Sequence, residues 1–88
     1  MSEEDFQAFL KDNGYSEGKS AGVFERFTDA HWDTVYFWEG GFIFLKRSVR
    51  EGDRWEGIRD FVIRELDKKS KEYVEMLLTD NFMIGDGE

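Results

Sequence analysis

Residues 34–47 read Thr-Val-Tyr-Phe-Trp-Glu-Gly-Gly-Phe-Ile-Phe-Leu-Lys-Arg and form the densest run of β-branched and aromatic residues in the chain. Two apolar segments flank Glu-Gly-Gly at residues 39–41, which is the pattern of a β-hairpin. An isolated two-stranded hairpin is only marginally stable in water. The rest of the chain is therefore expected to pack against this one.

The length of the turn decides which hairpin side chains share a face. A two-residue turn would mix aliphatic and aromatic groups on both faces, whereas a three-residue turn at 39–41 separates them, and we favour the latter. The aliphatic face then holds Val35, Phe37, Ile43 and Leu45, and the aromatic face holds Tyr36, Trp38, Phe42 and Phe44. The aromatic face is either covered by a second layer, which we favour, or left as a binding surface.

Segments with helical spacing lie on both sides of the hairpin, so the predicted fold class is α+β. Ser2 and the three acids after it predict a helix over about residues 3–12, and a weaker pattern predicts a second short helix near residues 20–30. Asp53 and Glu56 have the spacing of a capping box, which predicts a main helix packed on the aliphatic face. The predicted core is Phe37, Ile43, Leu45, Trp55, Ile58, Val62 and Leu66.

The end of the chain allows three interpretations. Lys-Lys-Ser-Lys at 68–71 interrupts the apolar pattern, so the main helix either continues with a polar turn in it or breaks near Ser70, with a further short helix after it. Strands at 72–78 and 82–84 around a turn are the third interpretation. We favour helix to about Thr79, because Glu, Met and Leu favour helices, followed by a short extended segment at 82–84 and a loose tail at 85–88.

Length and charge limit the classes of function. The 88 residues predict one small acidic domain over 1–88, and its net charge of −8 argues against direct binding to nucleic acid. The ends of the chain are acidic and the middle is mildly basic. The chain has no cysteine and no apolar run long enough for a membrane span, so we expect a cytoplasmic protein with no membrane contact.

No residue pattern predicts catalysis, and we expect no enzyme, no cofactor and no metal site. His31 is the only histidine, and with Asp33 nearby it still lacks the further ligands that a metal requires. Acids at 51, 53 and 56 could hold a divalent ion, but helix capping explains two of them better. Arg47, Arg50 and Arg54 are a weak candidate for anion binding.

The predicted function is a non-enzymatic protein-binding module whose partner carries a basic surface. A more specific form of this hypothesis is an inhibitor that occupies a nucleic-acid-binding surface by mimicking nucleic acid, because an acidic chain is attracted to such a surface. The expected contact residues are Glu3, Glu4, Asp5, Asp29, Asp33, Tyr36, Trp38, Glu39 and Phe42. The alternatives are a self-associating protein whose aromatic face closes a homodimer, and a small anion-binding domain.

Overall fold

The computed structural model describes residues 1–81, 83 and 84, which form one five-stranded antiparallel sheet, two α-helices and a short 3-10 helix. The elements are α1 (Glu3–Asp12), β1 (Ser16–Glu17), β2 (Val23–Phe27), β3 (His31–Trp38), β4 (Phe42–Glu51), β5 (Arg54–Ile63), η1 (Leu66–Lys68) and α2 (Lys71–Asp80). The strand order is β1-β2-β3-β4-β5, so each strand pairs with its neighbours in sequence. Neither α-helix in this part of the chain has the length and apolar character needed to cross a bilayer.

The central hairpin is confirmed as strands β3 and β4. Val35 pairs with Leu45 and Trp38 pairs with Phe42, which leaves residues 39–41 as a three-residue turn. Gly40 and Gly41 have φ angles of 82° and 80°, a region that favours glycine. The predicted separation of an aliphatic from an aromatic face is therefore correct.

The predicted arrangement of helices around a single hairpin is wrong. The segment near 20–30 contains strand β2, and the predicted main helix is strand β5. The sequence misled because β5 carries an irregularity: Arg47 pairs with Arg59 whereas Ser48 pairs with Gly57, so Ile58 is an extra residue. One inserted residue converts the two-residue period of a strand into the three- and four-residue spacing that resembles a helix.

The predicted capping box is also wrong, because Asp53 lies in a turn between two strands. Glu51 pairs with Arg54, which leaves Gly52 and Asp53 as a two-residue loop. Gly52 has a φ of 67°, as the first position of a type II′ hairpin turn requires. A glycine followed by aspartate between two β-rich runs is itself a hairpin signal.

Both α-helices begin at serine caps. Ser2 accepts a hydrogen bond from the backbone N–H of Asp5, and Ser70 accepts one from that of Tyr73, each at 3.1 Å. The predicted first helix is confirmed, and α2 starts after Ser70, as in the interpretation with a break there. Strand structure at 72–78 is wrong. Met83 and Ile84 are buried, whereas the predictions for residues 82 and 85–88 lie outside the described residues.

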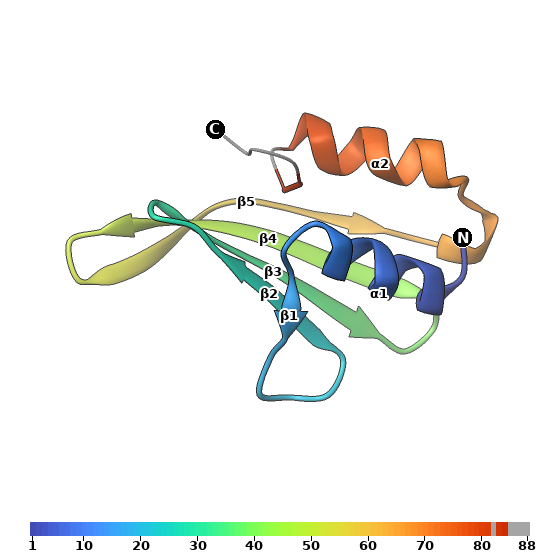
Figure 1. The fold of residues 1–88 in the computed structure, drawn as a ribbon, viewed down its shortest axis with the longest axis horizontal. Helices are drawn as coiled ribbons and strands as arrows, with labels where there is room; N and C mark the ends of the chain where they lie inside the picture. The colour runs from blue at the N-terminus through green and yellow to red at the C-terminus, as the bar shows by residue number, and fades with distance from the viewer. Residues whose placement is uncertain (82, 85–88) are drawn as a thin grey trace.

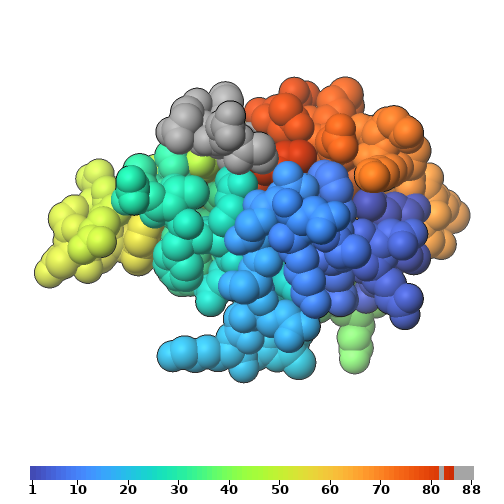
Figure 2. Space-filling model, viewed as in Figure 1, coloured from blue at the N-terminus to red at the C-terminus, as the bar shows by residue number. Residues whose placement is uncertain are grey.

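The two α-helices lie over the same face of the sheet (Figure 1). Their apolar side chains join those of the strands in one core of Phe6, Phe9, Leu10, Tyr15, Phe24, Val35, Ile43, Leu45, Ile63, Leu66, Val74, Leu78, Met83 and Ile84. Of the predicted core, Ile43, Leu45 and Leu66 are buried and Phe37 packs against them. The β4–β5 hairpin projects beyond the helices at one end of the molecule (Figure 2).

The other predicted core residues lie elsewhere. Ile58 is 53% and Val62 41% exposed, and Trp55 is half-buried among aromatic rings outside the core. Their exposure results from the strand structure of β5, in which alternate residues point to opposite faces of the sheet. Ile58 is in addition the extra residue of the irregularity. Their placement among core residues is corrected accordingly.

Candidate functional site

The face of the sheet opposite the helices, here called the open face, is rich in aromatic side chains. Strand alternation and register place on it Val23, Glu25, Phe27, Trp32, Thr34, Tyr36, Trp38, Phe42, Phe44, Lys46, Ser48, Arg50, Trp55, Gly57, Asp60 and Val62. No helix among the described residues covers it, since both α-helices pack on the opposite face. The favoured prediction that a second layer covers the aromatic face is therefore wrong.

The rings of the open face form two clusters. At one end Phe27 stacks on Trp32 with a centroid distance of 5.6 Å, and Trp55 meets both rings edge-on at 6.1 and 6.0 Å. At the other end Phe44 stacks on Trp38 at 5.3 Å and meets Tyr36 at 5.8 Å. These ring contacts restrict the rotamers of the aromatic side chains on the open face.

A polar strip separates the two ring clusters. It runs across four neighbouring strands as Glu25, Thr34, Lys46 and Asp60, which are successive register partners. The Glu25 carboxylate accepts a hydrogen bond from the Trp32 indole N–H at 3.1 Å, so this acid is held in position. The open face thus combines apolar rings with a central line of opposite charges.

Gly57 makes room for the Lys46 side chain. A Cβ atom at residue 57 would lie 2.7 Å from Lys46 Cε, so the lysine stem lies directly over the glycine. The same side chain forms part of the wall of a shallow hollow of about 310 Å³. The hollow is lined by Tyr36, Trp38, Phe44, Lys46 and Asp60, which suits stacking and hydrogen bonding.

Asp33 is not available to a partner, because its side chain is fully buried on the helix side of the sheet. It lies 2.9 Å from Arg26 Nη2 and 3.4 Å from Arg47 Nε, and both arginines are also buried. The three strands β2, β3 and β4 each contribute one member of this ion cluster. We therefore correct two predictions. Asp33 does not serve as a contact residue and Arg47 does not serve as an anion-binding residue, because both belong to this buried cluster.

Tyr15 lies beside the same ion cluster. Its ring stacks under the Arg26 guanidinium at 5.3 Å, and its hydroxyl donates to the Met83 carbonyl at 2.6 Å. Burial is the main cause that raises the pKa of Tyr15 well above its ordinary value, and the nearby Asp33 carboxylate raises it further. The phenol therefore remains a neutral hydrogen-bond donor over the physiological range.

The remaining predicted contact residues do not gather at one place. Glu3, Glu4 and Asp5 are exposed in the first turn of α1, on the helix side of the molecule. Asp29 and Glu39 are exposed in two different turns of the sheet. The structure thus separates the acidic start of the chain from the aromatic residues Tyr36, Trp38 and Phe42, which share the open face.

The two remaining arginines of the anion-binding alternative lie near the tip of the β4–β5 hairpin. Arg50 and Arg54 are both exposed, and the Arg50 Nε donates to the Gly52 carbonyl at 3.1 Å. Arg47 lies in the buried ion cluster with Asp33. The three arginines therefore do not form a common anion site.

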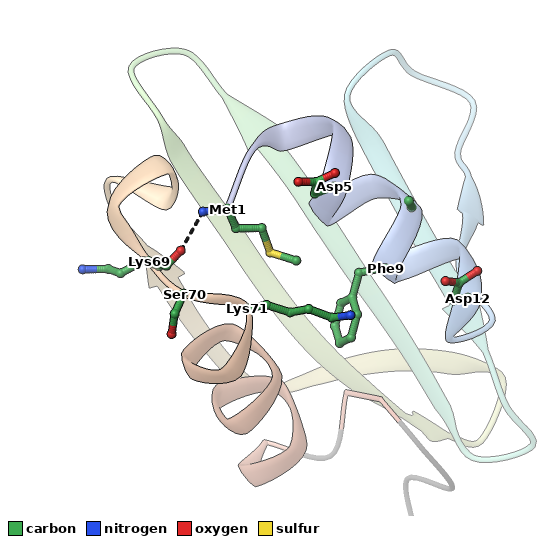
Figure 3. Close-up of a pocket in the computed structure, with 8 residues that line it drawn as sticks. Met1, Asp5, Phe9, Asp12, Lys69, Ser70 and Lys71 are labelled. Atoms are coloured by element: carbon green, nitrogen blue, oxygen red, sulfur yellow. Dashed lines mark hydrogen bonds between the residues drawn. The ribbon is translucent and has the colours of Figure 1, made fainter.

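A groove of about 410 Å³ lies between the two helices (Figure 3). It is lined by Met1, Asp5, Ala8, Phe9, Asp12, Lys69, Ser70 and Lys71. The amino group of Met1 closes one end by donating to the Lys69 carbonyl at 2.6 Å and the Leu66 carbonyl at 3.3 Å. This contact joins the start of α1 to the start of α2. The groove is therefore explained by the way the two helices pack beside each other.

His31 begins strand β3 and belongs to a turn. Its backbone N–H donates to the Thr28 hydroxyl at 3.0 Å, and its carbonyl accepts from the Thr28 N–H at 2.9 Å. Within residues 1–81, 83 and 84, no three His, Asp or Glu side chains come close enough together to hold a metal ion.

The sequence interpretation missed Phe27, Trp32 and Trp55 as members of the open face. The sequence pattern predicts helices at Phe27 and Trp55, and Trp32 lies between the predicted second helix and the hairpin. The signal for Trp32 was present, because Trp32, Thr34, Tyr36 and Trp38 alternate along one strand. Comparison of the chain with protein-family models, with curated proteins and with solved structures finds no match in any of the three.

Proposed function

We propose that this chain is a non-enzymatic protein-binding module that contacts its partner through the open face. The single observation that carries the proposal is the collection of aromatic side chains on a sheet face that the helices leave uncovered. Trp38 is 54%, Phe27 58% and Phe42 38% exposed. Aromatic residues that remain exposed in a prearranged cluster are typical of the energetically important centre of a protein interface.

The extent of the exposed apolar surface supports binding by a macromolecule. Given full burial areas of roughly 150–250 Å² per ring, Phe27, Trp38 and Phe42 together expose about 300 Å². Val62 and the half-buried rings add to this surface. The polar strip divides these exposed rings between the two ends of the open face, and exposed apolar patches are often functional. A flat, ring-lined face also suits a protein surface better than a small substrate, which is usually enclosed in a deep pocket.

The proposal is tested by affinity capture with a tagged protein and two double variants. Phe27→Ser with Trp38→Ser removes two exposed rings from the open face. Tyr73→Ser with Met76→Ser removes two side chains of similar exposure, 42% and 53%, from α2. We expect the open-face variant to lose its protein partners and the α2 variant to keep them. Identical partners for both variants would refute binding through the open face.

A second candidate function uses the helix side of the molecule. Residues 1–12 and 65–81 contain nine acidic and four basic residues, so this layer is strongly negative. We propose for it a partner with a basic, nucleic-acid-binding surface, so that the helices and not the aromatic face would carry the predicted mimicry. Its contact would weaken with salt, and Glu3→Lys with Glu4→Lys would lower the association rate. Binding that is unaffected by salt would remove this candidate.

A further inference from the structure

We infer that the partner on the open face is a second copy of this chain, in a twofold dimer whose axis runs along β3 over Thr34. This inference rests on the proposed function and names its partner. Two sheets would then pack face to face at about 10 Å, as in other two-sheet proteins.

The charge of the open face favours a second copy over a basic partner. Glu25 and Asp60 are negative. The positive residues are Lys46, Arg50, which pairs with Trp55, and Arg64, whose guanidinium lies 5.6 Å from the centre of the Phe42 ring. These three positive and two negative charges sum to +1, although the whole chain has a net charge of −8. An interface between identical subunits brings one surface against itself, so the charges on that surface can pair only where both signs are present. A basic partner would instead favour the acidic helices.

The register of the polar strip locates the twofold axis. Glu25, Thr34 and Lys46 lie side by side on β2, β3 and β4. A twofold axis along β3 exchanges the sides on which β2 and β4 lie. Glu25 of one copy then faces Lys46 of the partner subunit, and the same pair forms a second time. An axis perpendicular to the strands would place Glu25 against the partner's Glu25, which like-charge repulsion disfavours.

The aromatic residues agree with this axis. Trp38 and Tyr36 lie on β3, close to the axis, so each meets its counterpart in the other copy. Trp38 is 54% exposed although its other surface stacks on Phe44. A tryptophan contributes strongly to affinity where surrounding groups exclude water from it. The strip then supplies two charge pairs that fix the relative orientation of the copies.

The first experiment measures the mass in solution of the purified protein and of two matched variants. At about 100 μM we expect the wild type at twice its protomer mass of 10.4 kDa. Trp38→Lys should raise the dissociation constant about 30-fold or more, because it places two lysines together at the axis. Met76→Lys introduces the same charge at a side chain of matched exposure, 53%, on α2 and should remain dimeric. Circular dichroism confirms that both variants are folded.

A charge exchange tests the position of the axis. Lys46→Glu places a glutamate opposite Glu25 of the other copy at both pairs. We expect the dissociation constant to rise about tenfold or more, because each like-charge pair disfavours association. Adding Glu25→Lys to the same chain restores opposite charges at both pairs. The double variant should therefore recover most of the lost dimer. A double variant that associates no better than Lys46→Glu alone overturns the axis over Thr34.

The outcomes separate this inference from the proposed function. A wild type that is monomeric at about 100 μM overturns the dimer, and so does a Trp38→Lys variant that remains as dimeric as Met76→Lys. The proposed function survives that result if affinity capture still depends on Phe27 and Trp38. It fails as well if neither a second copy nor another protein depends on the open face.

Discussion

Asp33→Asn tests the structural role of the buried ion cluster. The Asp33 carboxylate is 0% exposed and contacts Arg26 at 2.9 Å and Arg47 at 3.4 Å. Asparagine keeps the shape of the side chain but removes the negative charge that both guanidiniums share. The loss of one member of a buried ion pair costs about 3–5 kcal/mol, because the remaining charge stays in a poorly hydrated interior.

That cost is a large part of the total stability. A chain of 88 residues is expected to have a free energy of unfolding of about 4–13 kcal/mol. With a dependence on urea of about 1 kcal/mol per molar, the midpoint of unfolding should fall by about 3 M or more. Urea unfolding followed by tryptophan fluorescence measures this shift directly.

The matched control is Asp29→Asn, which makes the same chemical change at an exposed turn residue. Its free energy of unfolding should remain within about 0.5 kcal/mol of the wild type. If the midpoints of the two variants fall equally, the argument that the Asp33 carboxylate holds β2, β3 and β4 together is refuted.

Three further predictions concern β5, Tyr15 and the central turn. Ile58→Asp should change the free energy of unfolding by about 0.5 kcal/mol or less, because Ile58 is 53% exposed, whereas Ile63→Asp at 2% exposure should unfold the protein in a denaturation assay. The raised pKa of Tyr15 means that the phenol of the unfolded chain ionises first, so stability is complete below about pH 10 and falls above it by up to about 1.4 kcal/mol per pH unit. Tyr15→Phe should flatten that fall in urea titrations between pH 9 and 11. Gly41→Ala should lower the free energy of unfolding by about 1–2 kcal/mol, because φ is 80° at this position. No atom lies within 4 Å of the new methyl group, so the cost comes from the backbone alone. Gly41→Asn should cost less, and thermal melting of both variants measures the difference.

The hairpin could be predicted because its information is local. Two glycines define the turn, and strict alternation on either side sorts Val35 and Leu45 from Tyr36 and Phe44. The first helix was predictable for the same reason, since Ser2 and the acids after it are adjacent in sequence. These elements do not depend on residues far along the chain.

Strands β2 and β5 could not be assigned in this way. The extra residue Ile58 gives β5 an apolar spacing that a helix shares, and the pairing with β4 that resolves the ambiguity is a tertiary interaction. Tyr36, Trp38 and Phe42 were correctly placed on one face by alternation. Asp33 was misplaced although it has the same parity as the inward-facing Val35, so for that residue the signal was available.

The meander order of the sheet has a consequence for the speed of folding. Because every strand pairs with its neighbour in sequence, each pairing closes only a short loop, and the chain can assemble the sheet one hairpin after another. Proteins with such local contacts have low contact order and fold quickly for their class. The long-range step is the docking of the helices, which joins Met1 to Lys69 across 68 positions of the chain. We therefore expect sheet formation to precede completion of the core, with the meeting of the two helices as the slower event.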